Sequence, residues 1–371
     1  MKKSILFLFL ILSISFIFQC FASNDEIDNR VGHAIPTPVG WPTEDELVPT
    51  GTTYYVNTAS TAGGTGLTNA TTGDDRAFAT LSEAESLNLD LTTATGIDDN
   101  VIIQCSGTSA DTTTFTWSGW TTEVGHQIYV VGDYNITTGV HWSDSYYHLV
   151  TSGTTITVQQ NYINFIKIQF ATTQTTDNAT IVNTDSPFAI NSTWKRCIFK
   201  GSNNSNGHQG MFIASAATST VNIYNCIYYD CYGGVGNAAT NIYAASTNVT
   251  VNIYNSTLSG AYWGVRIAAS VSINIINSAI FNNTDDISGT PTTLTYTACD
   301  DADCDSGTGN VGLADNSTDW NTLFVDYSNK NFHILNTDSA LYNVGSDLSS
   351  YFTNDIDNAT RSTFDIGADE L

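Results

Sequence analysis

The chain has 371 residues, of which 36 are acidic and 11 are basic, so its formal net charge is −25 at neutral pH. A charge this negative argues against nucleic-acid binding, and against direct binding of an acidic polysaccharide without a bridging cation. Hydrophobic residues make up 41% of the chain and aromatic residues 11%, which is enough apolar surface to exclude a disordered protein.

The first 22 residues have the pattern of a signal peptide. Two lysines at residues 2–3 precede an almost unbroken apolar run, residues 4–18, and the small residues Cys20 and Ala22 stand where a signal peptidase cuts. The run is short for a membrane-spanning helix, and no second apolar run of that length follows. We therefore expect a secreted or cell-surface protein with cleavage after Ala22 and no membrane span in its mature form.

The next two segments are predicted to lead into the fold. Residues 23–52 have the pattern of a linker, because four of the six prolines fall there and no hydrophobic period is visible. Residues 53–100 are expected to hold a first strand, Tyr54–Asn57, and a cap. Within residues 76–88 the apolar residues have helical spacing, which predicts a short amphipathic helix. Such a helix would cover the open end of a stack of coils, which otherwise exposes its core and its strand edges.

Residues 101–290 contain short strand-like segments in a repeating frame. An asparagine followed by a small residue recurs at Asn225, Asn255 and Asn277, after residues that alternate between apolar and polar as in a half-buried strand. Asparagine tolerates the left-handed backbone of a sharp bend. The three amides are therefore expected to stack about 4.8 Å apart along a parallel ladder and to hydrogen-bond to one another.

This frame favours one fold over its main competitor. A β-sandwich also has many short strands, but it needs hairpin turns, and the chain offers a single Asn-Gly pair, Asn206-Gly207. We therefore predict an all-β fold, a right-handed parallel β-helix with a short N-terminal capping helix. Its coils are expected over residues 101–290.

Six cysteines remain once Cys20 has left with the signal peptide, and an even number in an oxidising compartment permits disulfides. Cys299 and Cys304 are the preferred pair, because they lie close together in a loop-like segment. Cys197 and Cys226 occupy equivalent repeat positions. They could form a disulfide between coils or remain two reduced, buried thiols, which is the interpretation we favour.

The same loop carries alternating carboxylates, Asp301, Asp303 and Asp305, as calcium-binding loops do, since Ca²⁺ takes six to eight hard oxygen ligands. The pattern departs from an EF-hand, because Gly307 falls one residue late and the twelfth position is Gly312. Two interpretations stay open, a calcium site stiffened by the neighbouring disulfide and a solvated acidic turn.

Three parts of the chain carry a family resemblance: the entry strand with the helix around Phe78–Leu81, the asparagine frame, and the C-terminal region with Asn331–Leu335 and Phe364–Glu370. Over residues 53–371 the chain resembles secreted bacterial right-handed β-helix proteins of the pectate-lyase-like superfamily. The resemblance implies that residues 291–371 form closing coils and a C-terminal cap. Members include polysaccharide lyases, glycoside hydrolases and surface proteins without known chemistry, so the fold does not settle the function.

The motifs of an enzyme are incomplete in this chain. Fragments around Asp185, His208 and Arg266 are similar to polygalacturonase motifs, but the expected aspartate pair is missing, since residues 186–206 contain no Asp or Glu. Such enzymes need paired carboxylates, because one donates a proton while the other activates water. With Asp230 added, these residues are the candidates for catalysis. The base of a lyase would come from the few basic residues, three of which cluster around one coil, Lys195, Arg196 and Lys200.

Aromatic residues supply the candidates for binding. Tyr232 and Tyr262 occupy equivalent repeat positions 30 residues apart, and Trp263 follows the second. Exposed rings on a β-helix would stack on sugars, whereas buried rings would only fill the core. Two functions therefore stay open. One is an extracellular module that binds polysaccharide or cell-surface glycan, or serves a structural role; the other is a polysaccharide lyase or glycoside hydrolase.

Overall fold

The computed structural model describes residues 50–134, 141–175, 179–202, 207–232, 239–268, 270–313 and 320–371. The predicted signal peptide and residues 23–49 of the predicted linker lie outside this part of the chain. Within the described residues, no helix has the length and apolar character needed to cross a membrane.

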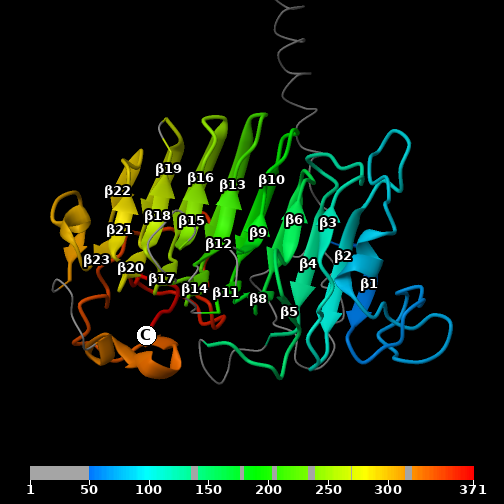
Figure 1. Ribbon diagram of the computed structural model, residues 1–371, viewed down its shortest axis with the longest axis horizontal. Helices are drawn as coiled ribbons and strands as arrows, with labels where there is room; N and C mark the ends of the chain where they lie inside the picture. Colours follow the sequence, from blue (N-terminus) through cyan, green and yellow to red (C-terminus); the bar gives the residue numbers. More distant parts are fainter. Residues whose placement is uncertain are drawn as a thin grey trace, which may run out of the picture. The chain divides into compact units, whose positions relative to one another are not determined.

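Three long parallel sheets form the body of the protein (Figure 1). The first consists of β1 (Gly51–Asn57), β2 (Asn100–Ser106), β4 (Ile128–Gly132), β7 (Ile163–Ile166), β10 (Asn191–Lys195), β13 (Ser219–Tyr224), β16 (Val249–Tyr254), β19 (Ser272–Ile276) and β22 (Thr293–Thr295). The second consists of β5 (His148–Thr151), β8 (Gln169–Thr172), β11 (Ile198–Lys200), β14 (Ile227–Tyr229), β17 (Thr257–Ser259), β20 (Ala279–Phe281), β23 (Ala298–Cys299) and β24 (Val311–Gly312). The third consists of β3 (Phe115–Trp117), β6 (Ile156–Val158), β9 (Ala179–Asn183), β12 (His208–Ile213), β15 (Thr240–Ala244), β18 (Trp263–Ile267) and β21 (Asp285–Ser288).

The chain visits the three sheets in turn, so each strand pairs with the equivalent strand of the next coil. In the first sheet, for example, Asn222 of β13 pairs with Asn252 of β16, which pairs with Asn274 of β19. The predicted all-β, parallel β-helix architecture is thereby confirmed.

A sharp bend, here called the first corner, joins the first sheet to the second in each coil. Its residue has a φ angle between 44° and 58° in five successive coils, at Lys167, Arg196, Asn225, Asn255 and Asn277. The three asparagines therefore lie at a left-handed bend, as their conformational tolerance predicts, and all three are buried.

The amide ladder expected at the first corner is only partly formed. Asn277 Nδ2 donates to Asn255 Oδ1 over 3.2 Å, but Asn255 donates to the carbonyl oxygen of Asp365 and Asn225 to that of Asn354. A continuous ladder lies instead on the outer face of the first sheet. There Asn274 donates to Asn252 over 2.9 Å and Asn252 to Asn222 over 2.8 Å.

A column of small residues follows the first corner on the inside of the coils. Cys197, Cys226, Ser256 and Ser278 are all buried. The backbone N–H of each of the first three donates to the side chain of the next, over 3.4, 3.2 and 3.3 Å. Cys197 and Cys226 are free thiols in this column, as expected for two reduced, buried cysteines without a disulfide between coils.

The N-terminal cap contains a helix shorter than the predicted segment, α2 (Leu81–Glu85). The Thr80 hydroxyl accepts from the backbone N–H of Glu83 over 3.2 Å, and the Glu83 carboxylate accepts from the N–H of Ala79 over 2.8 Å. This reciprocal arrangement satisfies N–H groups that a helix start otherwise leaves unpaired. Leu81 and Ala84 are buried in the main core, so the helix covers the first coil.

Replacing Thr80 by alanine is expected to lower the free energy of unfolding by about 1 kcal/mol, because the N–H of Glu83 loses the hydroxyl oxygen and keeps only the Thr80 carbonyl as acceptor. Urea denaturation measures the change. Ser82→Ala, in the same helix but without a capping bond in the described structure, is the matched control and should change stability by less than about 0.5 kcal/mol. Equal losses in the two variants would contradict the capping role.

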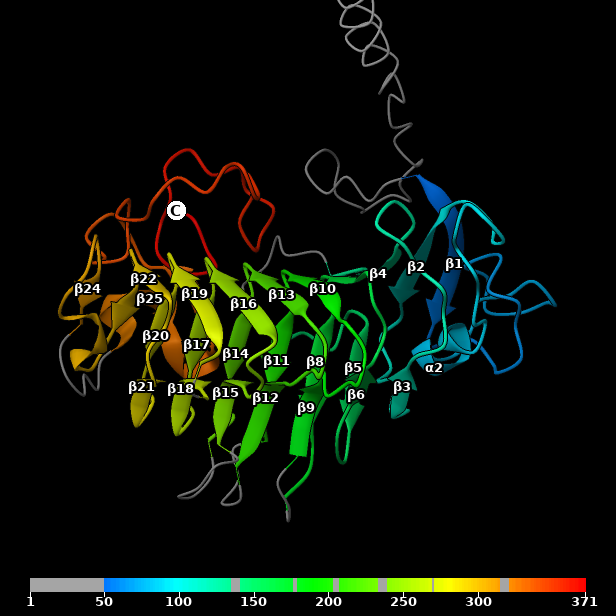
Figure 2. The same ribbon diagram turned by 90° about the horizontal axis from the view of Figure 1, so that it is seen from above.

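The coils continue into the predicted closing region, since β22, β23 and β24 still belong to the first and second sheets. From residue 320 onward the chain lies outside the three sheets, and β25 (Phe324–Asp326) and β26 (Asn331–Ile334) form an antiparallel pair. The C-terminal segment, residues 336–371, then runs back beside the ends of β16 and β19 (Figure 2). Short 3-10 helices complete this region and the turn before it, η1 (Ala302–Cys304), η2 (Trp320–Thr322) and η3 (Tyr327–Asn329).

The C-terminal segment lies against the first corner because it supplies partners for the buried polar groups there. Buried amide and guanidinium groups need partners, and the C-terminal segment supplies them. Arg196 donates to Asn358 Oδ1 over 2.7 Å, and Asn277 donates to the carbonyl oxygen of Ser346 over 2.7 Å. Phe352 and Phe364 add apolar contact by joining Tyr254 in a separate small core.

Candidate functional site

A cleft of about 410 Å³, here called the Trp142 cleft, lies beside β5, β8 and β11 of the second sheet. Its walls include Trp142 and Asp144 from the loop before β5, Lys200 at the end of β11, and Asp230 just after β14. One large aromatic ring therefore shares a concave site with two carboxylates and one ammonium group. This composition is typical of sites for small polar ligands.

The Trp142 ring is held from several sides. Its indole N–H donates to Asp144 Oδ1 over 2.6 Å, and its ring meets the ring of His148 nearly edge-on, with centroids 5.5 Å apart. The ammonium group of Lys200 lies 5.2 Å from the ring centroid, within the range of a cation–π interaction. The ring is therefore positioned before a ligand arrives.

The loop that carries Trp142 is itself fixed to the second sheet. The buried side chain of Gln169 in β8 accepts from the backbone N–H of Ser143 over 2.8 Å and donates to the Ser143 carbonyl over 2.9 Å. At the end of the loop, Asp133 Oδ1 accepts from the N–H of Tyr147 over 2.8 Å. Such preorganisation reduces the entropy that binding would otherwise cost.

Asp230 is the one catalytic candidate of the four that lines the Trp142 cleft. It lies at a left-handed position after β14, with a φ angle of 57°, and its carboxylate forms an ion pair of 3.0 Å with Lys330. Lys330 follows η3, so the C-terminal region neutralises one charge at the edge of the cleft.

His208 lies one hydrogen bond behind the cleft. It is buried at the start of β12, and its Nε2 is 2.7 Å from the hydroxyl oxygen of Ser202, which lines the cleft. Burial lowers the pKa of His208, which favours the neutral ring. The Ser202 hydroxyl donates to the carbonyl oxygen of Gln174 over 2.6 Å, so its proton does not point to His208 as in an activated nucleophile.

Arg266 lies in β18 of the third sheet and Asp185 just after β9, and neither lines the cleft with Asp230. The guanidinium group of Arg266 lies over the rings of Tyr243 and Trp263, 4.5 and 4.6 Å from their centroids. Asp185 follows β9, whose residue Asn183 is three strands from Arg266 in register, or about 14 Å. The four catalytic candidates therefore do not converge on one site.

None of the predicted stacking residues lines the Trp142 cleft. Tyr262 and Trp263 are half-buried, and their rings pack edge to face with centroids 4.7 Å apart. With Arg266 they form a second aromatic surface at β18, and Trp263 pairs in register with Asp285 of β21. Tyr232, 47% exposed, lies after β14.

The aspartates predicted to bind calcium are partly brought together. Carboxylate oxygens of Asp285, Asp301 and Asp303 lie within 4.8 Å of one another, but Asp305 does not belong to this group in the described part of the chain. Burial raises the pKa of Asp303 to about 6, and the nearby charge of Asp301 adds to the shift. The three side chains could offer only oxygen ligands, as calcium requires, and the calcium site stays a prediction.

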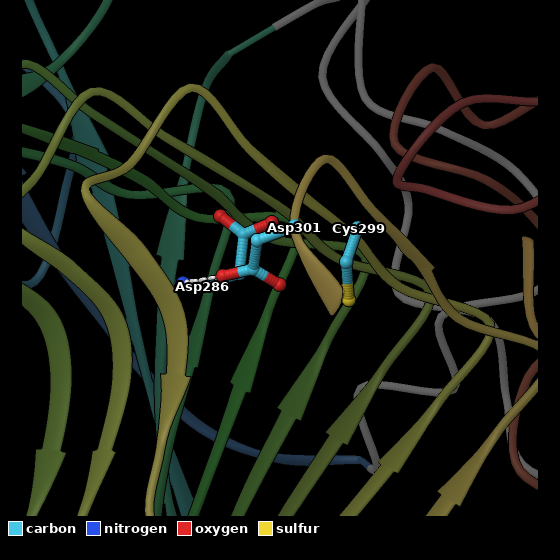
Figure 3. A group of neighbouring side chains, drawn as sticks. All are labelled: Asp286, Cys299 and Asp301. Carbon is cyan, nitrogen blue, oxygen red and sulfur yellow. Dashed lines mark hydrogen bonds between the residues drawn. The ribbon is translucent and has the colours of Figure 1, made fainter. Parts of the chain in front are cut away.

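A second, more deeply buried group shares Asp301 with the first and adds Asp286 and Cys299. Figure 3 shows Asp286 and Asp301 next to Cys299, and the Asp286 N–H donates to Asp301 Oδ2 over 2.8 Å. Cys299 is joined to Cys304 by a disulfide, so its sulfur is not a thiolate and offers no strong metal ligand. Burial raises the pKa of Asp286 to about 10, with the carboxylate of Asp300 as the next cause.

Trp142 is the cleft residue that the sequence did not single out. It lies outside the repeat frame, in the connection between β4 and β5, so no periodic position draws attention to it. The sequence around Trp142 offers one local indication of a site. An aromatic residue lies two positions before a carboxylate, Asp144, in a segment that does not repeat.

Comparison with known proteins identifies no relative of this chain. No family model, no curated protein and no solved structure matches it. The assignment of a function must therefore come from the sites themselves.

Proposed function

We propose that this chain is a secreted, glycan-binding β-helix protein of the pectate-lyase-like superfamily, and that its glycan lies in the Trp142 cleft. The signal-peptide pattern supports secretion, and the sequence resemblance together with the parallel sheets supports the superfamily. The observation that carries the binding proposal is the fixed Trp142 ring beside Asp144, Lys200 and Asp230. The ring offers a flat apolar surface to the C–H face of a sugar, and the charged groups hydrogen-bond its hydroxyls.

The charges of the cleft favour a neutral sugar. Asp144 and Asp230 contribute two carboxylates, against Lys200 in the cleft and Lys330 behind Asp230. The whole chain has a net charge of −25, which repels a polysaccharide that carries carboxylates. We therefore assign neutral extracellular polysaccharide or neutral cell-surface glycan as the ligand class.

A catalytic role is the second candidate function, and one observation favours it. Asp144 and Asp230 line the same cleft, and glycoside hydrolases use two carboxylates on either side of the bond they cleave. Lys200 is the only lysine or arginine among the described residues of the cleft wall, so it would be the base of a lyase. Hydrolysis would act on the same neutral glycan that the cleft binds, whereas elimination would require a uronic acid, so a panel that contains both kinds of polysaccharide separates the three activities.

Trp142→Ala is expected to weaken glycan binding by about 30-fold, because loss of an aromatic anchor costs about 2 kcal/mol. The purified protein would be passed over a panel of immobilised neutral and uronic-acid polysaccharides, and affinity would be measured by calorimetry on any glycan retained. Trp263→Ala, on the aromatic surface at β18, is the matched control and should bind as the wild type does.

Each other outcome has a distinct meaning. Retention lost in Trp263→Ala but kept in Trp142→Ala would move the binding site to the third sheet. New reducing ends or unsaturated products, lost in Asp144→Asn or Asp230→Asn, would replace the binding function by hydrolysis or elimination. Failure to retain any glycan, without products, would contradict both carbohydrate functions.

A further inference from the structure

A second group of metal-binding side chains lies in the C-terminal region, apart from the Trp142 cleft. His333 belongs to β26, whereas Asp357 and Asp369 belong to the C-terminal segment. One ring nitrogen of His333 and one carboxylate oxygen of each aspartate lie within 4.8 Å of one another. The His333 Nε2 atom is hydrogen-bonded to Asp357 Oδ2.

The orientation of the His333 ring is fixed by its other nitrogen. Nδ1 lies 2.6 Å from Asn331 Oδ1, and the same oxygen accepts from the His333 backbone N–H over 3.2 Å. An amide oxygen can only accept, so Nδ1 carries a proton and Nε2 is directed to the carboxylates. Histidines that bind metals are held in this way, with the distal N–H donated to an oxygen.

Two oxygens of this group lack the partners that buried carboxylates need. Asp369 is 3% exposed, and its Oδ2 accepts from the backbone N–H of Ile334 over 2.7 Å. Its Oδ1, like Oδ1 of Asp357, is buried and has no hydrogen-bond partner among the described residues. A buried carboxylate without compensation costs several kcal/mol, so a missing partner is expected at this point.

The buried side chain of Arg361, eight residues before Asp369, does not supply that partner. Arg361 donates to the carboxylate of Glu370 over 2.9 Å and to the carbonyl oxygens of Ala368 and Gly367. Its contact with Asp369 is to the backbone carbonyl, at 3.3 Å, and not to the carboxylate. The carboxylate of Asp369 therefore lies near His333 and Asp357 and receives no hydrogen bond from Arg361.

We propose that His333, Asp357 and Asp369 together bind one divalent transition-metal ion of the zinc class. An imidazole nitrogen and two carboxylates suit zinc, whereas calcium takes six to eight oxygen ligands and has no use for the ring. The three ligands leave a further coordination position to water. The ion would tie β26 to the C-terminal segment, which otherwise rests on the first corner through hydrogen bonds and the small core around Tyr254.

Zinc titration of the full-length secreted chain, stripped with a chelator, tests this site independently of any glycan. We expect one zinc ion per chain and a rise in melting temperature on zinc addition. In place of zinc, Co²⁺ should give a visible absorption spectrum, which reports the ligands directly. His333→Gln should abolish stoichiometric binding. Asn331→Ala removes the oxygen that orients the ring and should weaken binding by about 10–100-fold.

Asp301→Asn is the matched control, because it removes a carboxylate from the acidic group at β21 and leaves the His333 group intact. It should bind zinc as the wild type does. Circular dichroism of each variant confirms the fold before titration. Absence of stoichiometric zinc in the folded wild type would overturn the proposal, and so would zinc binding that survives His333→Gln or disappears in Asp301→Asn.

Discussion

Replacing Arg361 by methionine is expected to lower the free energy of unfolding by about 3–5 kcal/mol, the cost of breaking a buried ion pair from one side. Arg361 is 6% exposed, and its guanidinium group donates to Glu370, to Asn225 at the first corner, and to the carbonyl oxygen of Ala368. Methionine fills the space but leaves a buried carboxylate and several buried acceptors unpaired. Urea unfolding, followed by circular dichroism, measures the loss.

Two further substitutions test the cause. Arg361→Lys keeps the charge but not the planar group that bonds several acceptors at once, so its loss should be intermediate. Arg266→Met removes a half-buried arginine that lies over the rings of Tyr243 in β15 and Trp263 in β18, and it should cost less than about 1 kcal/mol. Amide hydrogen exchange in Arg361→Met should increase first in the C-terminal segment. A loss of less than about 1 kcal/mol would mean that this segment does not depend on Arg361 for its docking.

The bend positions show what local sequence can predict. Asn225, Asn255 and Asn277 were recognisable because asparagine tolerates a left-handed backbone, and this preference belongs to the residue itself. Arg196 has the same conformation, with a φ angle of 55°, although its side chain gives it no such preference. Its bend depends on the coils above and below it and on Asn358, 162 residues further along the chain.

Side-chain partners across the fold were not predictable in the same way. The Asn255 amide donates to Asp365, 110 residues away, so the ladder expected between neighbouring coils is interrupted by a segment that the repeat frame does not contain. Trp142 depends on Gln169, whose side chain holds the loop through Ser143. A periodic pattern predicts the coils, but the insertions that build a site obey no period, and only the folded arrangement shows what they approach.

The Asp286–Asp300 pair is expected to make the protein less stable as the pH rises above about 4. The folded-state pKa of Asp286 is raised to about 10 by burial and by the Asp300 carboxylate, whereas an unfolded aspartate titrates near 3.8. The folded protein therefore holds a proton that the unfolded chain releases. This contribution to stability is present in full below the ordinary pKa of an aspartate and declines as the pH rises above it, until Asp286 itself ionises.

Asp300→Asn should remove part of this decline and raise the free energy of unfolding at pH 8 by about 1 kcal/mol or more, the equivalent of one pKa unit. In the wild type, Asp300 Oδ1 accepts a hydrogen bond from the Asn282 N–H over 3.2 Å, and the amide oxygen of the asparagine can accept the same bond. The NH₂ group of the asparagine can in addition donate to Asp286. At pH 4, close to the ordinary pKa of an aspartate, the gain should be small because the folded and unfolded chains differ little in bound protons. Urea unfolding at pH 4, 6 and 8 gives the profile.

Asp338→Asn makes the same charge change at an exposed position and should show no such rise. Equal gains in both variants would trace the effect to net charge instead of the buried pair, because Asp300 lies beside Asp286 and Asp338 is exposed.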